Sequence, residues 1–417
     1  MTITKLTEEV LTIALQSSLT RIRVSDIILS YLHYFASMER SLFYMIYLDY
    51  NATTPIDDSV SKAMFPYITQ HFGNPSSGHE YGRIAKEAVE TARGQIASLL
   101  NAESDEIYFT SGGSESNNTA IKGAAWHSSK RGGQIITTAI EHPAVLNVCV
   151  WLHTQGFDVT YLPVDTYGRV RPTDLEAAMT SQTILVSIMH ANNEVGTIQP
   201  IRELAEISHR YGALFHTDAA QSVGKIPVDV KDLGVDFLTI VGHKMYAPKG
   251  IGALYMRRDI SIESLIHGAG HERGLRAGTE NVIFDVALGR ACEIAQGRLT
   301  DTSVKDLTDY FRDKLHTMLG DRIVLNGHPT ERLPNTLNIS FLGWNGHELL
   351  ARLPEIAAST GSACHSGETA LSPVLKAMMV SPERGRGAVR FSLGRYTQKS
   401  EIDQAIDQIT RTVNEVK

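Results

Sequence analysis

The chain has 417 residues, of which 42% are hydrophobic and 20% charged, and its formal net charge is −7. This composition is typical of a globular protein that is long enough for one large domain and a second, smaller one. The mild acidity gives no electrostatic reason to expect nucleic acid or an anionic membrane as a partner, and no apolar run reaches the roughly 18 residues needed to span a bilayer.

The sequence contains three cysteines, Cys149, Cys292 and Cys364. They are too few and too scattered for a disulfide framework or a zinc site, so we expect a reducing, cytoplasmic setting and no metal site. Cys149 and Cys292 lie in apolar helical stretches and are expected to be inert core residues. Cys364 differs from them, because it lies in the small and polar stretch "STGSACHSGE".

Residues 1–44 form an N-terminal extension of uncertain status. They have acidic residues among the first ten and no uninterrupted apolar stretch, so they make a poor secretory signal. Met38 and Met45 lie just ahead of the motif "IYLDYNATTP", which leaves open an internal start.

Residues 45–300 alternate between short β-branched or aromatic runs and longer runs with helical periodicity. This alternation predicts a large α/β ligand-binding domain, in which a mostly parallel seven-stranded sheet is flanked by helices. We expect the strands within residues 106–112, 134–142, 157–164, 183–194, 213–221, 235–244 and 251–258.

From about residue 301 the pattern changes to longer amphipathic helices with a few short strands. We therefore expect a smaller α+β C-terminal domain over residues 301–417, which carries the Cys364 loop. The first residues of the large domain are expected to pack with this small domain.

Five of the predicted strands end in polar clusters. Ligands of open α/β sheets bind outside the carboxyl ends of the strands, so five clusters at one edge imply a large polar ligand. The clusters are "SGGSESNN" (111–118), "EHP" (141–143), "NNE" (192–194), "DAAQS" (218–222) and "GHK" (242–244).

The chemistry of these clusters points to a cofactor. "SGGSE" before a helix suits a phosphate, although taken alone it is more simply a glycine turn with Ser114 as the helix N-cap. Asp218 ends an apolar run and is expected to be half-buried beside a cationic or N–H partner. Lys244 ends another run, where desolvation would favour a nucleophilic amine, although a solvated lysine is the simpler alternative for it alone. Together they describe a pyridoxal 5′-phosphate site, in which Lys244 forms the Schiff base and Asp218 keeps the pyridine nitrogen protonated.

Ten motifs resemble those of the cysteine desulfurases, which belong to the class-V aminotransferase group with the fold-type-I architecture of pyridoxal-phosphate enzymes. The resemblance implies a homodimer that removes sulfur from L-cysteine, giving L-alanine and a persulfide on Cys364. That sulfur would pass to an acceptor protein in iron–sulfur cluster, thio-cofactor or tRNA-thiolation pathways. The motifs run in consistent order from residue 46 to about 410: "YLDYNATTP", "FGNPSS", "FTSGGSESNN", "EHPAVL", "ANNEVG", "HTDAAQSVGK", "GHKMYAPKGIGALY", "RAGTEN", "GSACHSG" and "VRFSLGR".

The same resemblance assigns the residues that act on the substrate. Lys244 carries the cofactor, and His142 stacks on its ring and takes part in proton transfer. Arg390 clamps the substrate carboxylate, a task suited to a planar bidentate cation, and Asn193 lies beside the ring and the substrate. Cys364 is the nucleophile on a loop that swings between substrate and acceptor; it is also the residue left open to contact an iron–sulfur cluster during transfer.

The resemblance further assigns the residues that hold the cofactor. Asp218 pairs with the pyridinium nitrogen, and Gln221 contacts the phenolic oxygen. Val241 stands where many family members have a serine, so one hydroxyl contact to the phosphate is missing or replaced. The implied phosphate ligands are Gly113, Ser114, His243 and Thr279, the last reaching across to the partner subunit.

Three alternatives stay open at this point. The first is a selenocysteine lyase on the same scaffold, acting on L-selenocysteine. The second is a pyridoxal-phosphate aminotransferase or β-lyase in which Cys364 is incidental. The third, a scaffold without catalysis, is disfavoured because the four residues that chemistry requires are all present: Lys244, Asp218, Cys364 and Arg390.

Overall fold

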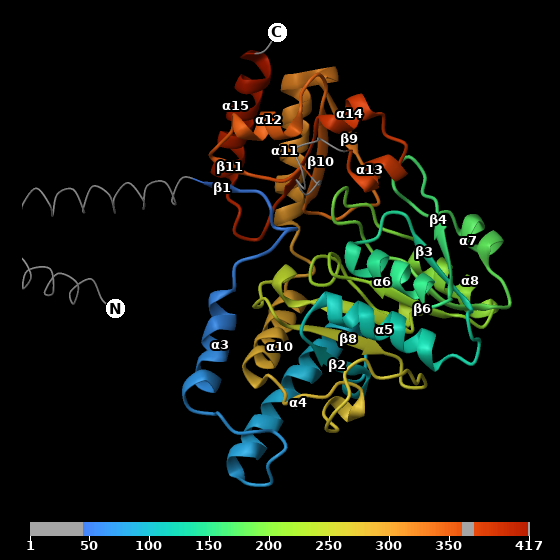
Figure 1. The fold of residues 1–417 in the computed structure, drawn as a ribbon. Helices are drawn as coiled ribbons and strands as arrows, with labels where there is room; N and C mark the ends of the chain where they lie inside the picture. The colour runs from blue at the N-terminus through green and yellow to red at the C-terminus, as the bar shows by residue number, and fades with distance from the viewer. Residues whose placement is uncertain (1–44, 361–370, 416–417) are drawn as a thin grey trace, which may run out of the picture.

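The fold is built on one seven-stranded sheet, seen in a computed structural model that describes residues 45–360 and 371–415 (Figure 1). The strand order is β2-β8-β7-β6-β5-β3-β4. The strands from β7 to β4 in this order run parallel, and β8 is antiparallel to both β7 and β2. The prediction of a mostly parallel α/β sheet is therefore confirmed. The strands are β2 (Ile107–Thr110), β3 (Gln134–Thr138), β4 (Asp158–Leu162), β5 (Thr183–Ser187), β6 (Leu214–Asp218), β7 (Phe237–Val241) and β8 (Gly252–Met256).

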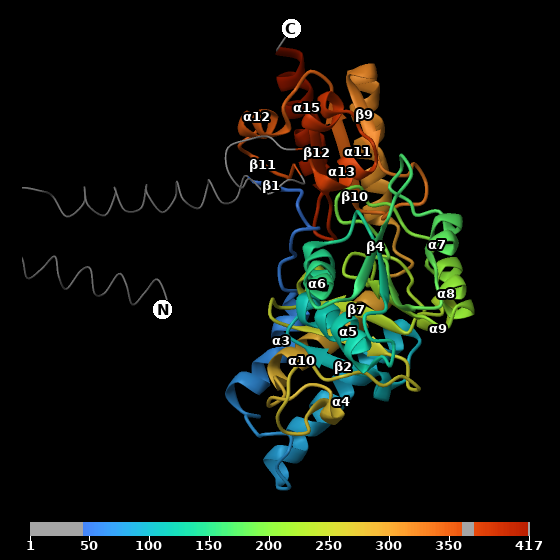
Figure 2. The ribbon, with the colours of Figure 1, turned by 45° about the vertical axis from the view of Figure 1, so that its right-hand side comes forward.

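Helices cover both faces of this sheet (Figures 1 and 2). Successive strand residues point to opposite faces, so a central strand that is buried on both sides reads as a continuous apolar run. Ile135 and Phe237 pack with α5 and α6, whereas their neighbours Ile136 and Leu238 lie in the core that includes α4, α8 and α10. The helices of this part are α3 (Asp58–Thr69), α4 (Glu80–Leu100), α5 (Gly113–His127), α6 (Pro143–Thr154), α7 (Pro172–Ala178), α8 (Ile201–Arg210), α9 (Val230–Leu233) and α10 (Val282–Gln296).

A second core forms around a three-stranded antiparallel sheet, β12-β10-β9. β1 joins it by pairing with β11 in parallel, so Ile46 and Leu48 pack among residues from the other end of the chain. The division into two domains at residue 300 stays a prediction. Val374 and Leu375, which follow that boundary in the sequence, pack in the core of the large sheet. The elements are β1 (Ile46–Tyr47), α11 (Ser303–Leu319), β9 (Ile323–Asn326), β10 (Thr336–Phe341), α12 (Gly346–Ala351), β11 (Ile356–Ala357), α13 (Pro373–Ala377), α14 (Pro382–Arg386), β12 (Ala388–Ser392) and α15 (Lys399–Glu415).

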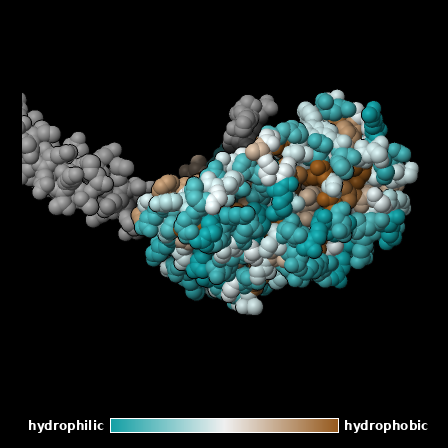
Figure 3. Space-filling view, turned by 90° about the horizontal axis from the view of Figure 1, so that it is seen from below, coloured by the Kyte–Doolittle hydropathy of each residue, from teal (hydrophilic) through white to brown (hydrophobic). Residues whose placement is uncertain are grey.

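The hydropathy of the surface agrees with the composition of a globular protein. Seen from below, it is mostly hydrophilic, with one hydrophobic area at the right of the view (Figure 3). Within the described ranges, no helix is both long and apolar enough to cross a membrane. The predictions made for residues 1–44 lie outside the described residues.

A buried ion pair anchors the loop between β8 and α10 to the edge of the sheet. Glu272 accepts hydrogen bonds from Arg93 at 2.8 and 2.9 Å and from the Phe109 N–H at 2.8 Å. The side chains of Glu272 and Arg93 are each 3% exposed. Glu272 and Arg273 have φ values of 45° and 53°, a left-handed conformation that is costly for residues with a Cβ. The ion pair therefore holds a strained loop in place, and this loop carries Thr279.

Replacing Glu272 by Ala should lower the free energy of unfolding by about 3–5 kcal/mol, because it leaves the buried Arg93 guanidinium with only the half-exposed Glu90 as a charge partner. Chemical denaturation of the purified variant measures this loss. The matched control is Glu80→Ala, which removes an exposed ion pair to Arg83 on α4 and should leave stability almost unchanged. Equal losses for the two variants would contradict the anchoring role.

Candidate active site

The strand ends open into a cavity of about 350 Å³, a size that suits a small-molecule ligand. Nine of the eleven residues predicted for the site line it: Gly113, Ser114, His142, Asn193, Asp218, Gln221, His243, Lys244 and Arg390. The structure thus brings together residues from all five polar clusters. Thr279 does not line this cavity, and Cys364 lies outside the described residues.

Lys244 follows β7 directly and is the last residue of a short 3-10 turn (Gly242–Lys244). Its Nζ donates hydrogen bonds to the carbonyl oxygens of Asn51 at 2.5 Å and Ala52 at 2.7 Å. Desolvation, reinforced by the positive charge of Arg390, lowers the pKa of Lys244 to about 8. The position therefore gives an amine that is neutral far more often near neutral pH than a solvated lysine would be.

Asp218 is the last residue of β6, the strand next to β7. It is more deeply buried than expected, with 7% of its surface exposed, because α5 lies over the strand end. Its carboxylate accepts hydrogen bonds from Asn117 Nδ2 at 2.7 Å and from the Ala220 N–H at 3.0 Å. Both partners are neutral, and no cation within the described residues forms an ion pair with Asp218. A buried carboxylate with this surrounding fits a ligand that brings its own positive charge.

Two histidines in the cavity wall are kept neutral. His142 caps the N-terminus of α6 by accepting a hydrogen bond at Nδ1 from the Ala144 N–H at 3.1 Å, which leaves the ring proton on Nε2. Burial and the charge of Lys244 lower the pKa of His142. Burial and Lys244 also lower the pKa of His243 to about 4, and its Nδ1 lies 3.1 Å from Thr53 Oγ1.

The start of α5 forms one end of the cavity. The N-cap is Gly112, with a φ of 145° that suits glycine, and Ser114 is the second residue of the helix. The reading of Ser114 as the N-cap is therefore wrong. The first N–H groups of a helix have no intrahelical partner, so this end of the cavity is suited to an anion. Gly113 packs against Val241, and a Cβ on it would lie 2.6 Å from Val241 Cγ2.

Arg390 enters the cavity from β12. Its guanidinium donates to Asp49 Oδ1 at 2.6 Å and to the Asn193 carbonyl at 3.0 Å. Its Nε is buried and has no partner among the described residues. Arg390, which was predicted to bind a carboxylate, is thus already paired with the carboxylate of Asp49, while its Nε–H still lacks an acceptor.

Sequence reasoning missed Asn51, which connects the parts of the site. Its carbonyl accepts from Lys244 and from Gln221 Nε2, the latter at 3.0 Å. Its side chain donates to the Asn193 carbonyl at 3.2 Å and to Thr336 Oγ1 at 2.8 Å. The motif "YLDYNATTP" carries Asn51 and Asp49, but nothing in the sequence placed this segment at the strand ends.

Residues 46–405 match the family model described as Aminotransferase class-V. Together with the mostly parallel sheet and the cavity at its strand ends, this match shows that the chain belongs to the class-V aminotransferase family. A more specific relationship comes from single relatives. The cysteine desulfurase IscS of Dictyoglomus turgidum is 48% identical over 377 residues, which cover 89% of this chain and 95% of that protein. Within the family, the chain therefore belongs to the cysteine desulfurases.

Solved structures agree with this assignment. A NifS-like protein superposes with a TM-score of 0.83 at 38% identity, covering 89% of this chain and all of the other. SspA, solved in complex with cysteine, superposes with a TM-score of 0.74 at 38% identity, covering 85% of this chain and 100% of SspA. The fold-type-I architecture predicted from the motifs is thus shared with these proteins.

Replacing Gly113 by Ala should lower the free energy of unfolding by about 1–3 kcal/mol, because the added methyl group overpacks against Val241. Urea denaturation measures the loss. In a Val241→Ala background the same Gly113→Ala change should cost clearly less, because the opposing Cγ2 is gone. An equal cost in both backgrounds would mean that the contact with Val241 does not require a glycine at position 113.

Proposed function

We propose that the chain is a pyridoxal-phosphate-dependent desulfurase that removes sulfur from L-cysteine and passes it to an acceptor protein. The observation that carries this proposal is the placement of Asp218 and Lys244 at the carboxyl ends of two adjacent parallel strands. One is a buried carboxylate without a cationic partner, and the other is an amine with a lowered pKa. SspA binds cysteine, which supports the choice of substrate.

The cavity residues fit this cofactor. Lys244 would hold its aldehyde carbon, Asp218 its ring nitrogen and Gln221 its phenolic oxygen, with His142 against the ring. The N–H groups at the start of α5, with Ser114 and His243, would bind the phosphate; Val241 brings no hydroxyl to it. When bound, the cofactor supplies an electron sink for the negative charge that develops at the substrate α-carbon.

The protein residues perform the remaining tasks. Arg390 binds the substrate carboxylate, and Lys244 removes the α-proton, for which an amine with a pKa near 8 is well matched. The thiolate of Cys364 then attacks the substrate sulfur. A sulfur–sulfur bond forms as the carbon–sulfur bond breaks. The electron pair of the broken bond stays with the substrate, whose β-carbon takes up a proton, and the α-carbon then regains the proton that Lys244 removed. The products are L-alanine and a persulfide on Cys364.

The described residues on either side of Cys364 support its access to the cavity. Ser359 and Arg390 exchange backbone hydrogen bonds of 3.2 and 2.6 Å. Ser372 donates to Glu194 at 2.5 Å, next to Asn193. Cys364 is four residues from Thr360, a span of roughly 14 Å when extended. Both anchors of the segment thus lie beside residues that line the cavity.

The proposal includes a homodimer and a cytoplasmic location. Thr279 is exposed and lies outside its own cavity, as expected of a residue that serves a second copy. Phe65, Ile68 and Phe72 expose 62, 56 and 77% of their surface, an apolar area that a second copy would cover. Cys149 and Cys292 are free, as in a reducing compartment. L-selenocysteine is a further proposed substrate, because its weaker carbon–selenium bond demands no additional residue.

After reaction with L-cysteine, mass spectrometry should find one added sulfur atom on Cys364. The Cys364→Ala variant should lose sulfide release in the presence of a small thiol by roughly a hundredfold or more, because the nucleophile is gone. Cys149→Ala and Cys292→Ala are the controls, since burial raises the pKa of both thiols and neither should change the labelling. Full sulfur release by Cys364→Ala would rule the mechanism out.

The rate at which cofactor-free protein combines with pyridoxal 5′-phosphate should rise with pH and level off above about pH 8. Only the neutral amine attacks an aldehyde, and the pKa of Lys244 is lowered to about 8. An unperturbed lysine would continue to gain rate up to about pH 10. Absorbance of the product measures the rate, and Arg390→Met should shift the midpoint upward because it removes a neighbouring positive charge. A midpoint near pH 10 in the unaltered protein would contradict the assignment.

A further inference from the structure

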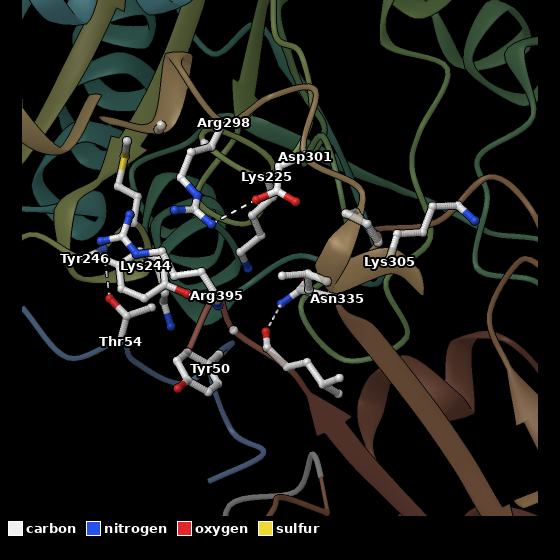
Figure 4. Close-up of a pocket in the computed structure, with 17 residues that line it drawn as sticks. Tyr50, Thr54, Lys225, Lys244, Tyr246, Arg298, Asp301, Lys305, Asn335 and Arg395 are labelled. Carbon is white, nitrogen blue, oxygen red and sulfur yellow. Dashed lines mark hydrogen bonds and ion pairs between the residues drawn. The ribbon is translucent and has the colours of Figure 1, made fainter. Parts of the chain in front are cut away.

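A second cavity is lined by Lys225, Lys244 and Arg395, among other residues (Figure 4). It is small, about 90 Å³, and Lys244 lines both it and the catalytic cavity. Lys225 extends into the second cavity from the segment that follows β6 (Figure 4). The steps proposed above assign no role to Lys225.

Lys225 makes two short hydrogen bonds toward the catalytic cavity. Its Nζ donates to Gln221 Oε1 at 2.8 Å and to Asn51 Oδ1 at 2.9 Å. It takes part in no ion pair within the described ranges. Its amine is therefore held by two neutral amide oxygens and by no charged partner among the described residues.

These bonds decide which way two amides face. An ammonium group only donates, so the oxygens of Gln221 and Asn51 must point toward Lys225. Gln221 Nε2 then faces the other way and donates to the Asn51 carbonyl at 3.0 Å. An amide NH₂ has two hydrogens, so one donor of Gln221 is left for the catalytic cavity, which Gln221 lines.

The second amide is locked by the same logic. Asn335 Nδ2 also donates to Asn51 Oδ1, at 3.0 Å, and Thr336 Oγ1 donates to Asn335 Oδ1 at 3.1 Å. Asn51 Nδ2 completes the ring by donating to Thr336. Each amide in this ring has one preferred orientation, because a flip would set donor against donor or acceptor against acceptor.

The charges around Lys225 are mostly positive. Desolvation, with the charges of Lys244 and Arg390, lowers the pKa of Lys225 well below its usual value. A neutral amine would still have the two N–H groups that the two bonds require. Because the Asn51 carbonyl only accepts, it keeps Gln221 Nε2 on its own side whether or not Lys225 is charged. The other titratable groups that line the second cavity are Tyr50, Tyr246, Arg298, Asp301, Lys305 and Arg395.

We propose that Lys225 is a positioning residue that turns the amide of Gln221 so that its N–H faces the phenolic oxygen of the cofactor. This inference rests on the proposed function, since it concerns the same cofactor. A donor at the phenolic oxygen stabilises negative charge there, so the proton shared by that oxygen and the Lys244 nitrogen is lost at a lower pH. Without Lys225, the amide loses one of the two contacts that orient it and is held only by the bond from its Nε2 to the Asn51 carbonyl, so it presents its oxygen to the cavity more often.

The test follows the visible absorbance of the holoenzyme as a function of pH. Lys225→Met should move the midpoint upward by about half a pH unit or more, because a donor to the phenolic oxygen is lost. Gln221→Ala should shift it in the same direction. The double variant should shift it no further than Gln221→Ala alone, because Lys225 acts through Gln221. Lys225→Arg, which keeps N–H donors, should restore part of the original midpoint.

Lys305→Met is the matched control. Lys305 lines the same cavity and has the same side chain, but it points away from Lys225 (Figure 4) and pairs with Asp309. Its removal should leave the midpoint unchanged. An unmoved midpoint in Lys225→Met, or additive shifts in the double variant, would overturn the proposal. If Lys225→Met fails to fold, Lys225→Ala, alone and combined with Gln221→Ala, gives the same test of additivity.

The absorbance distinguishes a wrong function from a wrong role for Lys225. A protein that binds no pyridoxal phosphate has no visible absorbance to titrate, and this would refute the proposed function itself. A normal absorbance with an unmoved midpoint would refute the role of Lys225 alone.

Discussion

The site depends on holding a carboxylate and an amine at the ends of neighbouring strands, where water is largely excluded. Parallel pairing of β6 with β7 places Asp218 at the end of one strand and the short turn that carries Lys244 directly after the end of the other. Burial then acts on the two groups in a complementary way. It weakens the proton affinity of the Lys244 amine and leaves the Asp218 carboxylate in need of a positive charge. A ligand that brings a carbonyl and a protonatable ring nitrogen meets both requirements.

The segment that contains Asp49 and Asn51 connects the two halves of the site. Asn51 contacts Lys244 and Gln221 from the large sheet and Thr336 from the small one. Asp49 pairs with Arg390 of β12 in the same region. Arg390 and Lys244, to which we assign the substrate and the cofactor, therefore come from elements of different cores, and this short segment contacts both.

Local pattern was sufficient to predict the sheet and most of the cavity. Each of the seven strands begins and ends inside its predicted range, because a strand buried on both faces leaves a continuous apolar run between turn residues. The polar residues that follow these strands could be placed by the same rule. Asn51 and Lys225 could not, because their role lies in contacts between segments that are distant in the chain or in the direction of one hydrogen bond. Asn117 belongs to a predicted cluster, but its bond to Asp218 could not be predicted for the same reason. β1, β9 and β11 were missed; β1 and β11 have two residues each, too few to carry a periodic pattern.

The pairing of β1 with β11 also has a consequence for biosynthesis. Ile46 lies opposite Ile356, so the ribosome must add about 310 residues after the first strand before its partner exists. At roughly 5–20 residues per second, this takes about 15–60 s. Until α11 is made, from Ser303 onward, Ile46 and Leu48 have no apolar surface of the second core to cover them. The large sheet, whose strands are all made by Met256, is available to fold first, and the cleft that Arg390 completes is assembled only as translation ends.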